Sequence, residues 1–472
     1  MSATDARIAT PVAGRELHAL AHHQVLQRES ADGCHVQVRA FGPCVVQAIG
    51  PHGLAVDVQE ATSEGPLSLW LPTGGPYGIV TTGVDGRRML ATDLLVGDLW
   101  VLAGQSNMEG CGRMAGREEA GPQVRVLDMS GCWRLAQEPL HLRWLSPHAV
   151  HARIDAEHQA EHAQQAKEPG AVAYIDAHVE ADEVPTNGFL IGVGPGVSFA
   201  NELVRRQRVP IGLIPAAHGN TAMAQWSPLL ADDGSSLFGA MLHSVRVAGG
   251  SVTGVLWYQG ENDADTSRPY TYDEELAELF AAMRQRTGNP DLMILTVQLG
   301  RFTQPSADAA FNAIWSRLRE SQRRCPAATA VVSAVDLDLE DPIHLSTSGQ
   351  LRLGRRLARV AAGVPGIDLA GAAVVRDGLA LDVRFTGVVG RLMSLGGRPS
   401  GFSVRSAEGE DCNLVFAADL LPDGDGYRLR LSRRLQPGER LWYGYGADPT
   451  CNLIDEEDMA VPAFGPVELS LS

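Results

Sequence analysis

The sequence lacks a block of basic residues and any long apolar run. Its 472 residues carry 39 Lys and Arg against 56 Asp and Glu, for a formal net charge of −17. Because nucleic acids and anionic membrane surfaces bind clustered positive charge, this balance argues against both as partners. No stretch approaches the roughly 20 apolar residues of a membrane-spanning helix, and the N-terminus lacks the basic start and apolar core of a secretory signal. We therefore expect a cytoplasmic protein, with a periplasmic or secreted protein as the alternative if a signal was removed.

Cysteine motifs and nucleotide-binding motifs are also absent. The seven cysteines are scattered without a Cys-x-x-Cys pair, so neither a zinc cluster nor a disulfide framework is predicted. No Gly-Lys-Ser/Thr phosphate loop occurs, and no Rossmann glycine fingerprint follows a strand. We expect no metal and no cofactor. The composition, 44% hydrophobic and 20% charged, is that of a globular protein, and the length suits two or three domains.

The spacing of apolar residues divides the chain into three parts. Residues 1–95 show short alternating stretches separated by Gly and Pro, which is typical of an antiparallel β domain. In residues 96–365 strand and helix patterns alternate, which predicts an α/β domain whose parallel sheet is covered by helices on both faces. Period-two alternation returns in residues 366–472, where we expect a second β domain. The Ala-, His-, Gln- and Glu-rich segment 149–185 indicates a helical insertion.

Within the α/β part, ligands should bind at the carboxyl ends of the parallel strands. The polar residues that follow each expected strand are therefore the candidates for chemistry. The expected strands are 94–102, 123–127, 211–214, 252–258, 293–299 and 329–335, and the expected helices lie near 197–207, 235–248, 271–287, 309–323 and 347–362.

The segment from Gly97 to Gly110 contains the strongest candidate for a reactive side chain. A buried-strand pattern ends at Gly104, which permits a tight turn, and Ser106 follows in a Gly-Gln-Ser-Asn-Met sequence. An α/β hydrolytic fold places its nucleophile at such a strand end. Most serines in turns bond only to nearby backbone, so Ser106 needs partners elsewhere in the chain.

Acyl transfer by serine needs a base, a carboxylate that orients the base, and donors for the oxyanion. Asp341 and His344 lie three residues apart in a loop that follows the expected strand 329–335. Such a loop can fold the carboxylate against one imidazole nitrogen while the other nitrogen faces Ser106. An exposed histidine before a helix is the alternative interpretation.

Two other strand ends offer oxyanion donors. Gly219 can bring its N–H close to a reacting carbonyl because it has no side chain. The amide of Gln259 can donate, whereas Glu261 can only accept. The structural alternatives are a simple turn at Gly219, a buried ion-pair role for Glu261, and core positions for Trp226 and Trp257.

Two histidine features compete with this interpretation. His218 is a rival base for Ser106, although no carboxylate stands beside it in the sequence to orient it. His158 and His162 fit the His-x-x-Glu-His pattern of an inverted zinc-protease motif, and a helix would set both imidazoles on one face. The surrounding run is rich in Ala, Gln and Glu, so a solvated helix face explains the pattern equally well.

Several short blocks follow one another in a characteristic order. They are His22-His-Gln-Val-Leu-Gln-Arg28, Asp93-Leu-Leu-Val-Gly-Asp-Leu-Trp100 leading into Gly-Gln-Ser-Asn-Met, Gly219-Asn-Thr-Ala-Met-Ala-Gln-Trp226, Trp257-Tyr-Gln-Gly-Glu261, Asp341-Pro-Ile-His344 and Cys451-Asn-Leu-Ile454. In this order they resemble the sialate O-acetylesterase family, which is related to acetylxylan esterases of the SGNH hydrolase superfamily.

The resemblance implies a central SGNH-hydrolase domain with a flavodoxin-like parallel sheet, flanked by N- and C-terminal β domains, and a carbohydrate O-acetylesterase activity. It implies Ser106 as nucleophile, His344 as general base and then acid, and Asp341 as its orienter. The implied oxyanion hole consists of the N–H groups of Ser106 and Gly219 and the side chain of Gln259, with Asn262 as the alternative to Gln259. The substrate-binding candidates are Gln105, Asn107, Asn220, Trp226 and Glu261.

The resemblance leaves the substrate open. Asn220 replaces the second glycine of its block, and the final block looks closer to the acetylxylan-esterase branch. An acetylated sialic acid would need a cation for its carboxylate, for which Arg113, Arg268 and Arg301 are candidates; Tyr258 is a further candidate to stack on a sugar. Acetylated xylan or another glycan is the alternative substrate. A non-catalytic carbohydrate-binding protein is the alternative of another class, and no oligomeric state is predicted.

Overall fold

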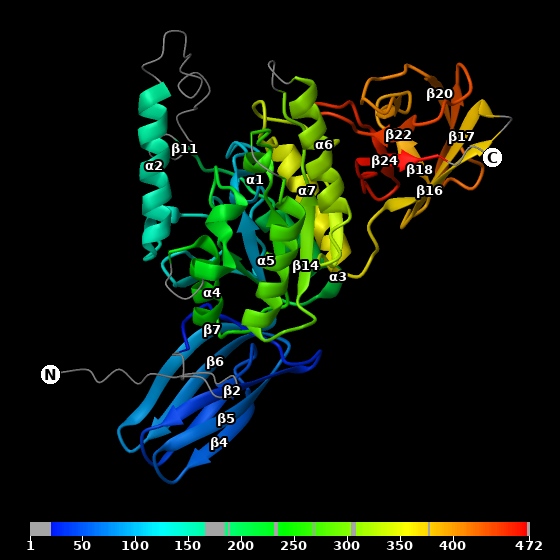
Figure 1. Ribbon diagram of the computed structural model, residues 1–472. Coiled ribbons are helices and arrows are strands. Elements are labelled where there is room, and N and C mark those ends of the chain that lie inside the picture. The colour runs from blue at the N-terminus through cyan, green and yellow to red at the C-terminus, as the bar shows by residue number, and fades with distance from the viewer. Residues whose placement is uncertain are drawn as a thin grey trace.

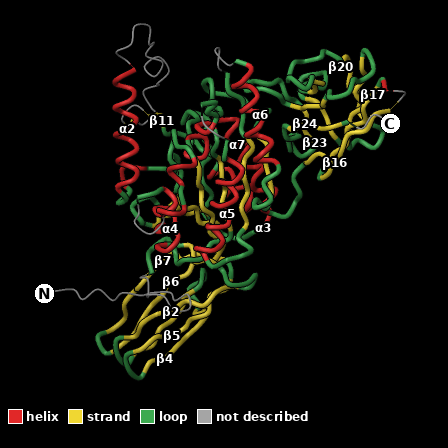
Figure 2. The backbone as a smooth tube through the Cα atoms, viewed as in Figure 1, coloured by secondary structure: helices red, strands yellow, loops and turns green. Residues whose placement is uncertain are grey.

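The computed structural model describes residues 20–165, 185–186, 189–230, 235–267, 270–303, 308–375 and 378–469. Helices surround a central, mostly parallel sheet, and further β sheets precede and follow it along the chain (Figure 1). Figure 2 shows that the helices gather around the central strands, whereas the N- and C-terminal parts consist of strands and loops. Within the described ranges, no helix is long and apolar enough to cross a membrane.

The N-terminal strands form a β structure with its own apolar core, and its ladders are antiparallel except that β1 runs parallel to β7. β2 pairs with β5, β3 pairs with β4 and β6, and β6 pairs with the first half of β7. Val36, Val38, Leu69 and Leu71 alternate along the β2/β5 ladder and are fully buried, as period two requires. The strands are β1 (Val25–Gln27), β2 (Gly33–Ala40), β3 (Cys44–Ile49), β4 (Ala55–Ala61), β5 (Gly65–Pro72), β6 (Gly74–Gly83) and β7 (Gly86–Gly104).

The second half of β7 is the middle strand of the central sheet, whose order is β15-β14-β13-β7-β12-β8-β9. All neighbours in this order are parallel except β8 and β9. Taken along the chain, β7, β12, β13, β14 and β15 have the flavodoxin-like order 2-1-3-4-5, and β8 and β9 extend the edge beyond β12. The added strands are β8 (Val124–Leu127), β9 (Trp133–Leu135), β12 (Ile211–Pro215), β13 (Gly254–Tyr258), β14 (Met293–Gln298) and β15 (Ala330–Ser333).

Helices pack on both faces of this sheet. Trp100 of β7 packs edge-on against Phe199 of α3, and Trp257 of β13 packs edge-on against Phe280 of α5. Because Trp257 pairs with Ala103, an odd number of residues after Trp100, the two tryptophans lie on opposite faces. The helices are α1 (Ser106–Glu109), α2 (Ala149–Gln165), α3 (Gly196–Gln207), α4 (Leu237–Val247), α5 (Tyr272–Thr287), α6 (Ala309–Arg323) and α7 (Thr347–Ala361).

The expected α/β elements are confirmed to within a few residues, with one correction. The strand expected over 94–102 is the last part of β7, which begins at Gly86 and is therefore shared with the N-terminal β structure. In the expected insertion 149–185, α2 accounts for the start, and the short pair β10 (Pro185–Thr186) and β11 (Phe189–Leu190) follows. Residues 166–184 lie outside the described residues.

The C-terminal strands form small antiparallel sheets, and the last of these strands packs on α6. The guanidinium of Arg319 on α6 is fully buried and donates to the carbonyls of Gly300, Gly444, Gly446 and Ala447. The strands are β16 (Asp368–Val375), β17 (Ala380–Thr386), β18 (Leu392–Ser394), β19 (Phe402–Arg405), β20 (Val415–Leu420), β21 (Gly426–Leu431), β22 (Arg440–Tyr443), β23 (Leu453–Asp455) and β24 (Phe464–Glu468).

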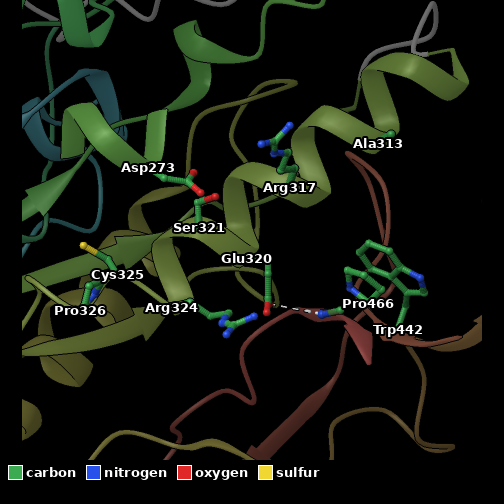
Figure 3. A pocket seen from close by; sticks show the side chains of 11 residues that line it. Asp273, Ala313, Arg317, Glu320, Ser321, Arg324, Cys325, Pro326, Trp442 and Pro466 are labelled. Atoms are coloured by element: carbon green, nitrogen blue, oxygen red, sulfur yellow. Dashed lines mark hydrogen bonds between the residues drawn. The ribbon is translucent and has the colours of Figure 1, made fainter. Parts of the chain in front are cut away.

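A cavity of about 530 Å³ lies where α6 meets the C-terminal strands (Figure 3). Arg317 of α6, Arg324 directly after α6 and Trp442 of β22 line it. Glu320 accepts the N–H of Gly465 at 3.3 Å across its wall, as the dashed line shows. Its lining contains none of the candidate site residues from the sequence, which lie at the ends of the central strands, so this cavity is separate from the candidate site.

Candidate active site

The end of β7 fixes the position of Ser106. Gly104 has a φ of 130°, and a Cβ at this position would lie 2.0 Å from the carbonyl oxygen of Tyr258, so the close approach of β7 and β13 requires glycine. The N–H of Gln105 donates to the same carbonyl at 2.8 Å. Ser106 then begins α1. In the sheet β12 lies on one side of β7 and β13 on the other, so the strand order reverses at β7 and Ser106 sits at the topological switch point, where such sheets bind ligands.

The structure brings Ser106, His344 and Asp341 together. Nε2 of His344 lies 2.9 Å from Oγ of Ser106, and Nδ1 lies 2.6 Å from Oδ2 of Asp341. The other carboxylate oxygen accepts the N–H groups of Ile343 at 2.9 Å and of His344 at 2.8 Å. Because an ionised carboxylate can only accept, Nδ1 carries the imidazole proton, and Nε2 is left to accept the hydroxyl proton of Ser106.

Burial, hydrogen bonding and charge shift the pKa values of Asp341 and His344 in opposite directions. Burial raises the pKa of Asp341, but its hydrogen bond with His344 and the charge of that ring bring the pKa below the ordinary value. Burial lowers the pKa of His344, whereas Cys111 and the Asp341 carboxylate raise it, and the pKa lies well above the ordinary value. About a quarter of each side chain, 24% and 25%, is exposed, so a substrate can reach the pair.

Asn107 ties the loop of His344 to the turn of Ser106. Its Oδ1 accepts the N–H of Leu345 at 2.9 Å, and its Nδ2 donates to the carbonyl of Ile343 at 3.2 Å and to Oε1 of Glu261 at 2.8 Å. Asn107 and Glu261 are both buried. The two residues were predicted to bind substrate; the structure instead uses them to hold His344 beside Ser106.

Three other candidate contacts also require correction. Trp226 is fully buried, with its ring centroid 4.9 Å from that of Trp257 in an edge-on arrangement, and Tyr258 is fully buried as well. Both side chains point into the core, so neither can stack on a sugar. Gln105 is buried, and its amide lies 3.0 Å from that of Asn262. Of the substrate-binding candidates, Asn220 is partly exposed.

Two of the three predicted oxyanion donors, Gly219 and Gln259, are engaged with protein groups. The N–H of Gly219 donates to Oε2 of Glu109 at 2.9 Å. Nε2 of Gln259 is fully enclosed and donates to the carbonyl of Thr221 at 3.0 Å and to Oδ2 of Asp263 at 2.5 Å. Gln259 thus holds the ends of β12 and β13 together.

Asn262 occupies a different position from Gln259. It is exposed, and its Nδ2 donates to Oδ1 of Asn220 at 2.6 Å. The side chains of Asn262 and Asn220 therefore meet at the mouth of the site, where a ligand can reach them. Between the two amides that the sequence left open, the arrangement favours Asn262 as a group that touches substrate.

A buried polar cluster behind Ser106 escaped the sequence interpretation. Glu109 lies 3.1 Å from Arg143, Arg143 lies 3.2 Å from Asp155, and Asp155 lies 3.5 Å from Nε2 of His218. His218 thus has a carboxylate partner after all, supplied by α2. Only Glu109 had a sequence signal, because it stands one helical turn after Ser106; Arg143 and Asp155 come from distant segments without a motif.

The histidines of α2 belong to the same cluster. Nδ1 of His151 lies 2.9 Å from Nδ1 of His218, and the ring of His158 is buried 6.4 Å from that of His218. Burial lowers the pKa of His218 to about 4. The side chain of His162 lies outside the described residues. Among the side chains that are described, no three His, Cys, Asp or Glu groups converge as a metal site would require.

The arginines proposed to bind a sialate carboxylate differ in their position relative to the loop of Asp341 and His344. Nε of Arg113 lies 2.7 Å from Oε1 of Glu340, the residue before Asp341. Arg301 pairs with Asp448 at 3.1 Å. Arg268 lies outside the described residues. Arg113 is therefore the described candidate that the structure places beside the loop of Asp341.

Several known proteins are similar to this chain in sequence or in fold. The model of a carbohydrate esterase family, described as sialic acid-specific acetylesterase, matches residues 96–362. A probable carbohydrate esterase from Arabidopsis thaliana is 29% identical over 291 residues, which are 60% of this chain and 96% of that protein. A carbohydrate acetylesterase from Xanthomonas citri has a crystal structure similar to this one, with a TM-score of 0.61, 24% identity and coverage of 94% of this chain and 97% of that chain.

Proposed function

Because the chain belongs to the carbohydrate esterase family of sialic acid-specific acetylesterases, and is thus an ester hydrolase, we propose that it removes O-acetyl groups from sialic acid by Ser-His-Asp chemistry. One observation carries the mechanism: Ser106, His344 and Asp341 form a continuous chain of hydrogen bonds at the carboxyl end of the middle strand. This is the arrangement that activates a serine hydroxyl as a nucleophile.

The reaction proceeds in two steps. Oγ of Ser106 attacks the acetyl carbonyl while Nε2 of His344 takes the hydroxyl proton, and the tetrahedral intermediate collapses as His344 returns this proton to the departing sugar oxygen. Water then attacks the acetyl-serine with His344 again as base, and acetate leaves. Asp341 keeps Nδ1 protonated and stabilises the imidazolium in both steps. No metal enters the scheme.

The oxyanion needs donors near Ser106. The backbone N–H of Ser106 lies in the first turn of α1, where helical N–H groups lack intrahelical partners. We assign the second donor to the exposed amide of Asn262, while Gly219 leaves room for the acetyl group through its missing side chain. Asn262→Ala should lower kcat about 10²- to 10³-fold. Gln259→Ala should mainly lower stability; equal losses of kcat in the folded variants would instead restore Gln259 as a donor.

The sialate carboxylate needs a cation, and Arg113 is proposed to supply it. Its side chain is 37% exposed and paired with Glu340 next to the catalytic loop. A carboxylate group can share the guanidinium, which has donors for two partners. Arg301 offers a matched control, since it is also a partly exposed arginine paired with one carboxylate.

Acetate release from 9-O-acetylated sialic acid and from acetylated xylo-oligosaccharides tests the assignment. We expect the sialate substrate to be preferred and Ser106→Ala to abolish acetate release. Arg113→Gln should lower kcat/KM for the sialate substrate about tenfold and leave kcat/KM for the neutral xylo-oligosaccharide unchanged. Arg301→Gln should leave kcat/KM for both substrates unchanged. Preference for the xylo-oligosaccharide would assign the chain to the acetylxylan-esterase branch. Sugar binding without acetate release would show a non-catalytic binding protein.

A further inference from the structure

The buried polar cluster behind Ser106 closes into a ring. Oε2 of Glu109 accepts the N–H of Gly219, and Arg143 lies 3.1 Å from Oε1 of the same carboxylate. The other end of Arg143 lies 3.2 Å from Asp155, and Asp155 lies 3.5 Å from His218. His218 is covalently joined to Gly219, so the contacts return to their starting point. We call these five residues the Glu109 ring.

Burial of the Glu109 ring carries a desolvation penalty, because it removes charged groups from water. The side chains of Glu109, Arg143 and His218 are 2%, 3% and 0% exposed. Burial raises the pKa of Glu109 to about 7, although Arg143 and the N–H of Gly219 both oppose this shift. Buried ion pairs add little net stability compared with well-packed apolar residues, and in several proteins they instead fix a specific geometry. The position of the ring therefore points to a role in geometry.

That geometry concerns the segment that faces Ser106. A Cβ at Gly219 would lie 3.5 Å from Cβ of Ser106 and 2.8 Å from Oε2 of Glu109, so the peptide passes between the nucleophile and the carboxylate. Glu109 and Ser106 lie on the same helical turn. The Glu109 carboxylate thus fixes the position of the Gly219 peptide relative to the Ser106 hydroxyl. The next residue, Asn220, accepts from the amide of Asn262 at 2.6 Å.

We propose that Glu109, held by Arg143 and by Asp155 of α2, is a positioning residue that sets the 218–220 segment and, through Asn220, aims the amide of Asn262 at the reacting carbonyl. This rests on the proposed esterase function. Loss of the anchor leaves substrate binding intact but misaligns a contact that forms only in the transition state, so kcat falls while KM changes little.

The central variant is Glu109→Gln, which keeps the size and one acceptor oxygen but removes the charge that holds Arg143. We expect kcat to fall about 10- to 100-fold with KM within about threefold of the parent enzyme. Arg143→Lys keeps a charge but cannot span two carboxylates, so it should also lower kcat. Combining both substitutions should cost scarcely more than either alone, because both release the same segment.

A matched control separates positioning from general destabilisation. Asp455 is a fully buried carboxylate that pairs with buried Arg359 at 3.0 Å, and neither residue belongs to the Glu109 ring. Asp455→Asn should lower the unfolding temperature and leave kcat of the folded enzyme within about twofold. If Glu109→Gln keeps kcat within the same range, or if both variants lose kcat alike, the positioning role is refuted.

Ser106→Ala, assayed in parallel on 4-nitrophenyl acetate, keeps the two proposals distinguishable. If Ser106→Ala retains full activity, the proposed function fails and the role of Glu109 falls with it. If Ser106→Ala is inactive while Glu109→Gln and Arg143→Lys match the parent enzyme, the proposed function stands and the role of the Glu109 ring alone is overturned.

Discussion

Two histidine–carboxylate pairs flank Ser106, and they differ in almost every physical respect. His344 lies 2.6 Å from Asp341 in a loop where about a quarter of each side chain is exposed. His218 lies 3.5 Å from Asp155 and is fully buried. The charge of Asp341 helps to raise the pKa of His344, whereas burial lowers that of His218 to about 4. Identical residue types thus give a partly exposed histidine of raised pKa beside Ser106 in one place and a fully buried histidine of lowered pKa in the other.

The difference shows that a carboxylate beside a histidine does not by itself make a base. Cys111 and the close contact of Asp341 together outweigh the effect of desolvation on the pKa of His344, while the longer contact of Asp155, which is shared with Arg143, cannot outweigh the effect of desolvation on the pKa of His218. Solvent access matters equally, because an acyl ester can reach only the first pair. The following predictions test this contrast in order of expected effect.

The largest expected effect comes from His344→Gln. Without an acceptor for the hydroxyl proton of Ser106, kcat should fall about 10⁴-fold, with little change in unfolding temperature. The matched variant His218→Gln should keep kcat within about tenfold but unfold at lower temperature, because the histidine is fully buried. Steady-state kinetics and thermal unfolding of both variants measure this. Similar losses of kcat would reinstate His218 as a base.

Asp341→Asn should lower kcat about 10²- to 10⁴-fold and also change the pH profile. His344 must be neutral to accept a proton, and the Asp341 carboxylate raises its pKa. Removing that charge lowers the pKa, so the ring becomes neutral at lower pH. The acid limb of kcat/KM should therefore move to lower pH. An unmoved limb would show that another group titrates there.

The buried pair should appear in the pH dependence of stability. The pKa of His218 is about 4 in the folded protein against an ordinary value of 6.5, so between these values only the unfolded chain takes up the proton. The contribution of neutral His218 to the free energy of unfolding is fully present above pH 6.5. It is lost as the pH falls, by about 2 kcal/mol at pH 5. Urea unfolding at pH 7 and pH 5 should show a smaller loss in His218→Gln than in the parent enzyme. Substitution of the exposed His52 should leave the loss unchanged.

The smallest expected effect is that of a chelator. His158 packs against His218, and none of the described side chains adds a third ligand. Incubation with EDTA should therefore change kcat by less than about twofold, whereas a zinc site on α2 would lose its metal and its function. Metal analysis of the purified protein provides an independent check. Inactivation by EDTA with rescue by zinc would contradict the prediction.

The sequence predicted the strand ends better than the directions of the side chains. The meeting of Ser106 with Asp341 and His344 could be predicted because each follows a recognisable strand pattern and the ends of parallel strands gather at one edge of the sheet; their catalytic roles stay a prediction. Trp226 and Tyr258 were misjudged because their contact with sugar depended on which way a side chain points, and both enter the core.

Long-range contacts set the other limit. Asp155 stands on α2, and Arg143 begins the 3₁₀ turn Arg143–Leu145 in a separate segment, so no local sequence pattern indicates that they meet near Gly219. For the same reason His218 looked isolated: its carboxylate partner lies 63 positions earlier in the chain. Such a cluster becomes visible only when the fold has brought its members together.

The shared strand β7 has a consequence for how the molecule comes apart. Its first half completes the N-terminal ladder with β6, and its second half is the middle of the central sheet that ends at Ser106. A shift of one residue in the N-terminal ladder would turn every following side chain to the opposite face and carry the serine about 3.3 Å along the strand. The two sheets therefore cannot unfold independently without displacing Ser106, the proposed nucleophile, and unfolding of the N-terminal strands should coincide with loss of activity.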